Sequence, residues 1–386
     1  MRTEFLPFHL PDVGEAEIHS VEQILRSGWL TTGPKVKEFE RQFAAFVGAR
    51  HAIAVNSCTA ALHLALDAIG LKEGDEVLVP TLTFAATAEV VFYFHARPVL
   101  VDCCPVTLNM DPNRIEQAIT PRTRAIIPVH FGGQPCEMEQ IRDIARKHNL
   151  AVIEDAAHAL PARYRGQMVG TIGDITCFSF YATKTITTGE GGMITTDNDE
   201  YADRMRIMSL HGISHDAWKR YTAQGSWRYD ILSPGYKYNL TDVAAALGVE
   251  QLKKCNLFHE KRKHLAGCFD RAFRDTPAIK TPVARDHIEH AWHLYVIQLD
   301  FDRLTINRDQ FIEELRHANI GCSVHFIPLH LHPFYRDTMH ADARQYPCAT
   351  QIFEKIISLP LYPRMSAQDQ QDVIDAVHRI IATHRQ

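Results

Sequence analysis

The sequence predicts an α/β protein with a mostly parallel seven-stranded sheet, helices on both faces of that sheet, and a smaller α+β domain at the carboxyl end. Short apolar runs alternate with amphipathic segments through the first half of the chain. These runs contain few polar residues, which is typical of parallel strands that are covered on both sides. After about residue 280 this alternation gives way to an α+β pattern.

The expected elements of the large domain follow one another in a regular order. The first strand is expected at 51–57 and the first helix at 59–69, where Leu62, Leu66 and Ile69 recur at helical spacing. A short polar loop joins the last two strands, which suits an antiparallel pair at one edge of the sheet. Further strands are expected at 74–80, 98–102, 125–130, 151–155, 175–180 and 192–196, with helical stretches around 84–94, 112–119 and 137–148.

The second half of the chain completes the large domain and forms the small one. The polar and aromatic stretch 214–238 has no clear period, so we expect a long ordered loop, and loops of this length are usually functional or interfacial. We place the domain boundary near residue 250, which gives a large domain over 1–250 and a small domain over 251–386. Helices are expected at 199–211, 241–254, 256–273 and 308–318, and a strand at 293–299.

The composition favours a globular protein that binds neither nucleic acid nor membranes. Hydrophobic residues make up 46% of the chain and charged residues 23%, and the net charge is −5. The first residues lack the pattern of a signal peptide, and no apolar run approaches the ~20 residues that span a bilayer. Nine cysteines occur without a CxxC pair, as expected for reduced, mostly buried thiols. These features together predict a cytoplasmic protein.

Polar residues stand where predicted strands end, which is the edge at which open parallel sheets bind ligands. Ser57, Cys58 and Thr59 close one strand and open a helix, so their backbone amides could hold a phosphate. A simple helix N-cap is the alternative interpretation. Asp155 ends an apolar strand, where a carboxylate either pairs with a buried cation or is a satisfied loop residue, and His158 follows it.

Lys184 stands just after another buried strand and is followed by Gly189, Gly191 and Gly192. Burial lowers the pKa of a lysine, so Lys184 could be a nucleophilic amine. An exposed lysine in a hairpin is the alternative. The glycines favour the nucleophile, because they allow the backbone to approach a bulky group closely.

Three segments together resemble the core of the DegT/StrS family: 154–158, 179–184 and 189–197. Members of that family are fold-type I enzymes that use pyridoxal 5′-phosphate (PLP) and act on nucleotide-linked keto-sugars. Further matches lie at 28–34, 74–80, 235–242 and 324–330, so the resemblance covers roughly residues 5–365.

The resemblance implies roles for individual residues. Lys184 carries PLP as a Schiff base and moves protons during the reaction, and Asp155 pairs with the pyridine nitrogen. Asn239 reaches the phosphate of a neighbouring subunit, so the active sites are shared within a homodimer. The resemblance also implies phosphate binding by Ser57, Thr59 and Ser179, a further cofactor contact from Cys58, ring contacts from Phe84 and His158, and a sugar-nucleotide pocket lined by Thr31, Thr32 and His325.

The implied reaction transfers the amino group of L-glutamate to a nucleotide-linked keto-sugar and releases 2-oxoglutarate. The segments 28–33 and 236–242 look most like the 4-keto group, including the UDP-4-amino-4-deoxy-arabinose enzymes. The product would be a 4-amino sugar nucleotide for cell-surface polysaccharide, such as lipopolysaccharide, or another glycoconjugate. A 3-keto sugar aminotransferase is an alternative. A PLP-dependent sugar dehydratase is another, although those relatives carry His where this chain has Lys184.

Two interpretations from other classes have less support. His325, His330 and His332 could suggest a metal site, but they flank Pro328 and have no obvious acidic partner, so no metal is expected. A nucleotide-dependent oxidoreductase would need a GxGxxG motif after the first strand, and none is present there.

Overall fold

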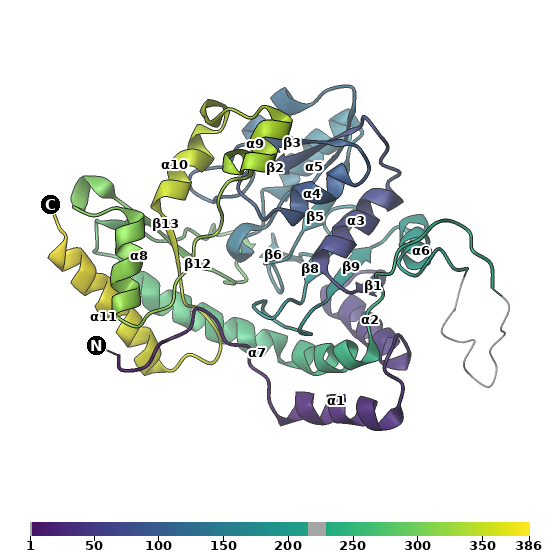
Figure 1. The fold of residues 1–386 in the computed structure, drawn as a ribbon, viewed down its shortest axis with the longest axis horizontal. Coiled ribbons are helices and arrows are strands. Elements are labelled where there is room, and N and C mark those ends of the chain that lie inside the picture. The colour runs from purple at the N-terminus through teal and green to yellow at the C-terminus, as the bar shows by residue number, and fades with distance from the viewer. Residues whose placement is uncertain (1, 215–228) are drawn as a thin grey trace.

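A computed structural model of the chain describes residues 2–214 and 229–386 (Figure 1). Its central sheet has seven strands in the order β1-β9-β8-β5-β4-β2-β3, which confirms the predicted fold class. The strands are β1 (His51–Val55), β2 (Glu76–Pro80), β3 (Arg97–Val101), β4 (Thr123–Ile126), β5 (Ala151–Asp155), β8 (Ile175–Ser179) and β9 (Gly192–Thr196).

One strand of the sheet, β9, runs antiparallel to its neighbours. The predicted antiparallel pairing of β8 with β9 is confirmed, but the predicted position of this pair at an edge of the sheet is wrong. β9 lies between β8 and β1, and it pairs antiparallel with both. The edge position belongs to β1, whose His51 lies opposite Thr196. This pairing joins segments far apart in the chain, so no local pattern encodes it.

Helices cover both faces of the sheet. Successive strand residues enter different cores: Val152 packs in one apolar cluster and Ile153 in the other, as the alternation of strand side chains requires. The helices are α1 (Glu15–Ser27), α2 (Pro34–Val47), α3 (Cys58–Ala68), α4 (Ala86–Phe92), α5 (Met138–His148), α6 (Asp199–Met208), α7 (Asp242–Phe273), α8 (Arg308–His317), α9 (Pro333–Met339), α10 (Pro347–Lys355) and α11 (Ala367–Thr383).

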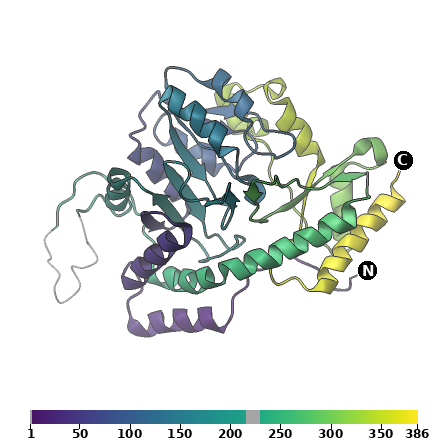
Figure 2. The same cartoon turned by 180° about the vertical axis from the view of Figure 1, so that it is seen from behind.

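The long helix α7 corrects two of the predicted elements. Helices were expected at 241–254 and 256–273, but α7 is continuous because the junction contains no proline and Cys255 is simply one of its buried residues. Figures 1 and 2 show α7 running from beneath the sheet to the carboxyl-terminal part of the molecule. Phe258 still packs in the core of the sheet, whereas Leu265 packs in the next core. The predicted boundary near 250 therefore falls within one helix.

The carboxyl-terminal part is built on a small sheet in the order β10-β12-β13, packed against α8, α11 and the end of α7. The amino terminus joins this part, because Leu6 forms a parallel bridge with Ile320. Both termini accordingly lie at the same end of the molecule (Figures 1 and 2). The remaining strands are β6 (Arg163–Tyr164), β7 (Gln167–Met168), β10 (Ile279–Lys280), β11 (Ile288–Glu289), β12 (Tyr295–Leu299) and β13 (Ile356–Leu359).

Other differences from the sequence-based expectations are local. The helix expected at 112–119 is two short 3₁₀ turns, Pro112–Arg114 and Glu116–Ala118. The loop expected at 214–238 lies mostly outside the described residues, and its described end returns to the sheet through a bridge between Asn239 and Val55. Among the described helices, none combines the length and the apolar character that crossing a membrane requires.

Candidate active site

A cavity of about 570 Å³ opens at the carboxyl ends of β1, β5 and β8. Its wall is formed by the carboxyl ends of these strands, by the carboxyl-terminal part of the molecule and by the amino-terminal segment, which contributes Phe8 and His9. Nine of the sequence-predicted site residues line this one cavity: Ser57, Cys58, Thr59, Phe84, Asp155, His158, Ser179, Lys184 and His325.

Lys184 lies in a turn after β8, where its backbone amide donates to the carbonyl of Tyr181. The side chain is enclosed by protein atoms yet keeps part of its surface open to the cavity. Burial lowers the pKa of Lys184 to about 8, and nearby Cys58 and Asp155 oppose this shift only in part. An amine with this pKa is available unprotonated to a far greater extent at neutral pH than an ordinary lysine.

Of the three glycines after Lys184, Gly192 permits a close contact between two backbone segments. A Cβ at Gly192 would lie 2.6 Å from the carbonyl carbon and oxygen of Ser57, so only glycine lets β9 pass beneath the turn between β1 and α3. Gly189 has a φ of +80°, which favours glycine for a different reason. Gly191 alone of the three also lines the cavity.

Asp155 is held by two hydrogen bonds at the end of β5. Its Oδ1 accepts from the Ala157 amide at 3.1 Å and its Oδ2 from Thr87 Oγ1 at 2.8 Å. Burial raises the pKa of Asp155, and these two donors partly offset that shift. A carboxylate has about four acceptor positions, so capacity remains for a cationic partner in the cavity.

Thr87 and Thr83 form a hydroxyl chain that sequence reasoning missed. Because Thr87 donates its proton to Asp155, the 2.8 Å bond between the two threonines must have Thr83 as donor. Both threonines are buried. The only sequence signal for this hydroxyl chain was the presence of two threonines four residues apart, shortly after β2. Nothing in the local sequence links Thr87 to Asp155, which lies 68 positions away.

The turn between β1 and α3 presents polar groups to the cavity. Ser57 is the N-cap of α3, with its Oγ accepting from the Ala60 amide at 3.0 Å, so the capping interpretation holds. The preceding amides of the first turn have no intrahelical acceptor, and the positive end of the helix dipole lies here. Ser179 approaches from β8. Such a turn suits an anionic group.

Histidines surround the opposite part of the cavity. The His158 ring stacks on Phe326 with centroids 5.9 Å apart and lies 4.4 Å from the His293 ring. Burial lowers the pKa of His158 and of His293 well below the usual range, so both rings are neutral. His9 and His293, which sequence reasoning missed, each keep one buried ring nitrogen without a partner among the described residues. Unpaired buried nitrogens beside a cavity favour a polar ligand.

His325 donates or accepts through Nδ1 to Ser358 Oγ at 2.8 Å and stacks on Phe8. Burial lowers the pKa of His325 to about 4. His330 lies elsewhere, with its two ring nitrogens bonded to the hydroxyls of Thr81 and Thr350. Hydroxyl groups thus engage both ring nitrogens of His330.

Three predicted site residues do not line the cavity of their own chain. Asn239 Nδ2 donates to Thr32 Oγ1 at 2.7 Å, and Thr32 Oγ1 donates to the Leu240 carbonyl at 2.5 Å. Asp242 fixes this region, because its carboxylate accepts from the Gly33, Lys35 and Val36 amides and so caps α2. The Thr31 carbonyl accepts from the Asp242 amide. The motifs at 28–34 and 235–242 thus meet in space, outside the cavity.

The profile of the DegT/DnrJ/EryC1/StrS aminotransferase family matches residues 11–378. The chain belongs to this family. An uncharacterised protein of Methanocaldococcus jannaschii, MJ1066, is 52% identical over 385 residues, 100% of both chains. The aminotransferase is also 51% identical over 381 residues to the spore coat polysaccharide biosynthesis protein SpsC of Bacillus subtilis, 98% of each chain.

Solved structures agree with this assignment. The putative sugar aminotransferase Spr1654 of Streptococcus pneumoniae, in its PMP form, matches with a TM-score of 0.92 and 35% identity over 98% of this chain and 99% of that one. Its PLP form matches similarly, with a TM-score of 0.91 and 34% identity over 98% of this chain and 99% of that one. This aminotransferase is therefore a fold-type I, PLP-dependent enzyme that acts on a sugar. The cavity fits PLP chemically, since it joins an amine of lowered pKa, a carboxylate with spare acceptor capacity and an anion-binding turn.

Proposed function

We propose that this aminotransferase moves the amino group of L-glutamate to C4 of a nucleotide-linked 4-keto sugar. The observation that carries the proposal is the convergence of Lys184, Asp155 and the β1–α3 turn on one cavity large enough for a cofactor and part of a sugar. The relationship to SpsC supports a product for polysaccharide synthesis. The 4-keto position rests on the segments 28–33 and 236–242, and a 3-keto sugar is the alternative.

Six side chains and the start of α3 would hold PLP. Ser57, Thr59 and Ser179, with the amides at the start of α3, would bind its phosphate. Asp155 would pair with the pyridine nitrogen, and Phe84 and His158 would contact the ring. When bound, PLP supplies a conjugated ring that withdraws electrons from the carbon that loses a proton. The thiol of Cys58 would contribute packing only, because burial raises its pKa well above the usual value.

Lys184 has two tasks in this proposal. Its unprotonated Nζ would hold the cofactor in the resting enzyme. Once free, the same Nζ would accept a proton from the carbon that bears the amino group and return it to the carbon on the other side of that nitrogen, so one group would serve as base and then as acid. The lowered pKa of about 8 suits both directions of transfer near neutral pH.

The sugar would lie toward the carboxyl-terminal part of the cavity wall. Phe326 and His325 lie on that side, and neutral His9 and His293 offer unpaired nitrogens that match hydroxyl groups. Because Thr31, Thr32 and Asn239 do not reach the cavity of their own chain, we propose that they serve the cavity of a second subunit in a homodimer.

The proposal is tested by supplying the purified enzyme with glutamate and a panel of 3-keto and 4-keto sugar nucleotides. We expect an amino sugar and 2-oxoglutarate in equal amounts from a 4-keto member, identified by NMR. Lys184→Ala should lose all turnover, whereas Lys253→Ala, which changes an exposed lysine paired with Glu250, should retain it. Amination of 3-keto members alone would overturn the 4-keto assignment, and loss of the keto-sugar without 2-oxoglutarate would indicate a dehydratase.

A further inference from the structure

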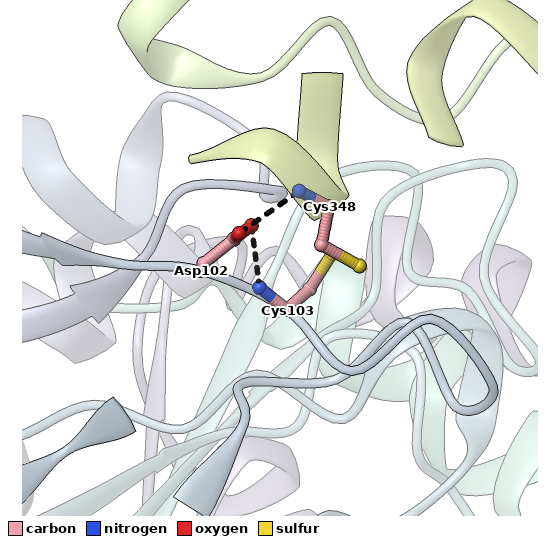
Figure 3. Close-up of side chains that lie close together, drawn as sticks. All are labelled: Asp102, Cys103 and Cys348. Atoms are coloured by element: carbon pink, nitrogen blue, oxygen red, sulfur yellow. Dashed lines mark hydrogen bonds between the residues drawn. The ribbon is translucent and has the colours of Figure 1, made fainter. Parts of the chain in front are cut away.

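Two cysteines lie together where the sheet meets the carboxyl-terminal part of the molecule. Cys103 follows β3, and Cys348 lies in the first turn of α10, 245 positions later in the chain. Their Sγ atoms are 3.9 Å apart, with Cys103 donating its S–H to Cys348. Figure 3 shows the two side chains pointing toward one another beside Asp102.

The approach of the two thiols is fixed by Asp102. Its carboxylate accepts hydrogen bonds from the amides of Cys103 at 2.9 Å and Cys348 at 3.0 Å (Figure 3). It also accepts from the amide of Ala349 at 2.9 Å. The last two bonds cap α10, so they tie the start of this helix to the end of β3. Because the carboxylate already accepts three amide bonds, it is a poor metal ligand, and the chemistry left to this cluster is that of the two thiols.

The two thiols differ in a way that suits stepwise oxidation. Cys348 is partly exposed and stands at a helix N-terminus, whereas Cys103 is buried, with 2% of its surface exposed. The hydrogen bond from Cys103 lowers the pKa of the Cys348 thiol, against the opposing effects of burial and Asp102. The same contact and burial raise the pKa of Cys103. Cys348 is therefore the thiolate that an external oxidant meets first.

We propose that Cys103 and Cys348 form a reversible disulfide on exposure to a low-molecular-weight disulfide such as oxidised glutathione. The Cys348 thiolate attacks one sulfur of the oxidant, which forms a mixed disulfide and releases one thiol. Cys103 Sγ then attacks Cys348 Sγ and expels the second sulfur of the oxidant as a thiolate, which takes up the proton of Cys103. The two protein thiols are oxidised, and the external disulfide is reduced to two thiols.

The bridge would lie behind the wall of the active-site cavity. Cys103 and Cys348 belong to an apolar cluster that also contains Leu294 and Phe326, and both of these residues line the cavity. A covalent link here closes a long loop of the chain and constrains the unfolded state. We therefore expect the oxidised enzyme to resist urea better than the reduced enzyme.

The experiment treats the PLP-loaded enzyme with oxidised glutathione, blocks the remaining thiols and maps peptides without reduction. We expect a peptide linked through Cys103 and Cys348, a higher urea midpoint, and reversal of both by dithiothreitol. Cys104→Ser removes the adjacent cysteine and is the matched control, which should behave as wild type. Cys348→Ser and Cys103→Ser should form no link and show no shift, and Cys103→Ala replaces Cys103→Ser if the serine variant does not fold.

Three outcomes would overturn the proposal. They are a link through Cys104 in place of Cys103, a glutathione adduct that persists on Cys348, and a bound zinc ion, found by native mass spectrometry, that protects both thiols. Because this test does not measure sugar amination, its outcome is independent of the proposed reaction.

Discussion

At the scale of single residues, the chemistry depends on how Asp155 is held. Asp155 itself could be predicted from its place after an apolar strand and from the motif around it. Thr87, Thr83, His9 and His293 could not, because they reach the site through contacts between distant parts of the chain. A hydroxyl near a helix start carries no signal of its partner in the sequence. Site residues at the ends of strands can thus be predicted from the sequence, whereas the residues that contact and support them are known only from the structure.

Thr87 provides a test of this support. Thr87→Val keeps the shape of the side chain but removes the donor to Asp155, whose pKa should rise further. A hydrogen bond to a charged group is worth about 1.5–3 kcal/mol, so we expect kcat to fall about 10- to 100-fold. Since a higher pKa means that Asp155 becomes protonated at higher pH, the acid limb of the pH–rate profile should move upward.

Thr87→Ser retains the hydroxyl and should restore both the rate and the profile. Thr83→Val, which removes only the second hydroxyl of the chain, should have a smaller effect. An unchanged acid limb in Thr87→Val would show that Thr87 acts by packing alone.

At the scale of elements, the sequence predicted all seven strands of the central sheet within a few residues, because most of them are rich in apolar residues and bounded by polar segments. It did not predict the order of β9 and β1, and it divided α7 at Cys255. The reason is the same in both cases. Periodicity reports which residues are buried, but not which distant segment buries them. Gly192 is an example of such a distant contact, because it must be glycine to leave room for the backbone of Ser57.

Gly192→Ala should therefore damage the turn that we propose for phosphate binding. The new Cβ would meet the backbone of Ser57 at 2.6 Å, and a backbone can yield only by moving. We expect a loss of about 1–3 kcal/mol in the free energy of unfolding and weaker PLP binding. Urea denaturation and fluorescence titration of the apoenzyme with PLP measure the two effects.

Gly267→Ala is the matched control for this substitution. Gly267 lies inside α7, and the nearest atom to a new Cβ is Arg271 Nη1 at 3.6 Å. Alanine is the better helix former, so this variant should gain about 0.5–1 kcal/mol and bind PLP normally. Equal PLP affinity in Gly192→Ala and Gly267→Ala would show that Gly192 does not contribute to PLP binding.

At the scale of the whole molecule, α7 connects the core of the sheet with the core of the carboxyl-terminal part. The sequence predicted two domains with a boundary near residue 250. That position lies inside a continuous helix, so the sequence has no linker there that could mark a boundary. The cavity lies between the sheet edge and the carboxyl-terminal part, so its shape depends on how both pack. The cavity of the same chain is not lined by Asn239, Thr31 or Thr32. If these residues have the roles that we propose, they act in the cavity of a second subunit.

The shared site leads to a complementation test. If Asn239 serves the partner's site in a twofold dimer, each site combines Lys184 of one subunit with Asn239 of the other. Asn239→Ala and Lys184→Ala should each be weak or inactive alone. In a mixed dimer, one site then carries both lesions and the other carries neither. Half of randomly assembled dimers are mixed and each has one intact site, so joint refolding should recover up to about a quarter of wild-type activity.

The control for this test uses a second residue that lies in the same subunit's cavity as Lys184. Asp155 lies at 2.8 Å from Thr87 of its own chain and lines the same cavity as Lys184. Asp155→Ala mixed with Lys184→Ala should therefore gain nothing, because every site keeps a lesion. Mass spectrometry under native conditions must confirm that mixed dimers form in both mixtures. If the Asn239→Ala mixture also gains no activity, Asn239 does not serve a partner's site and the shared site is wrong.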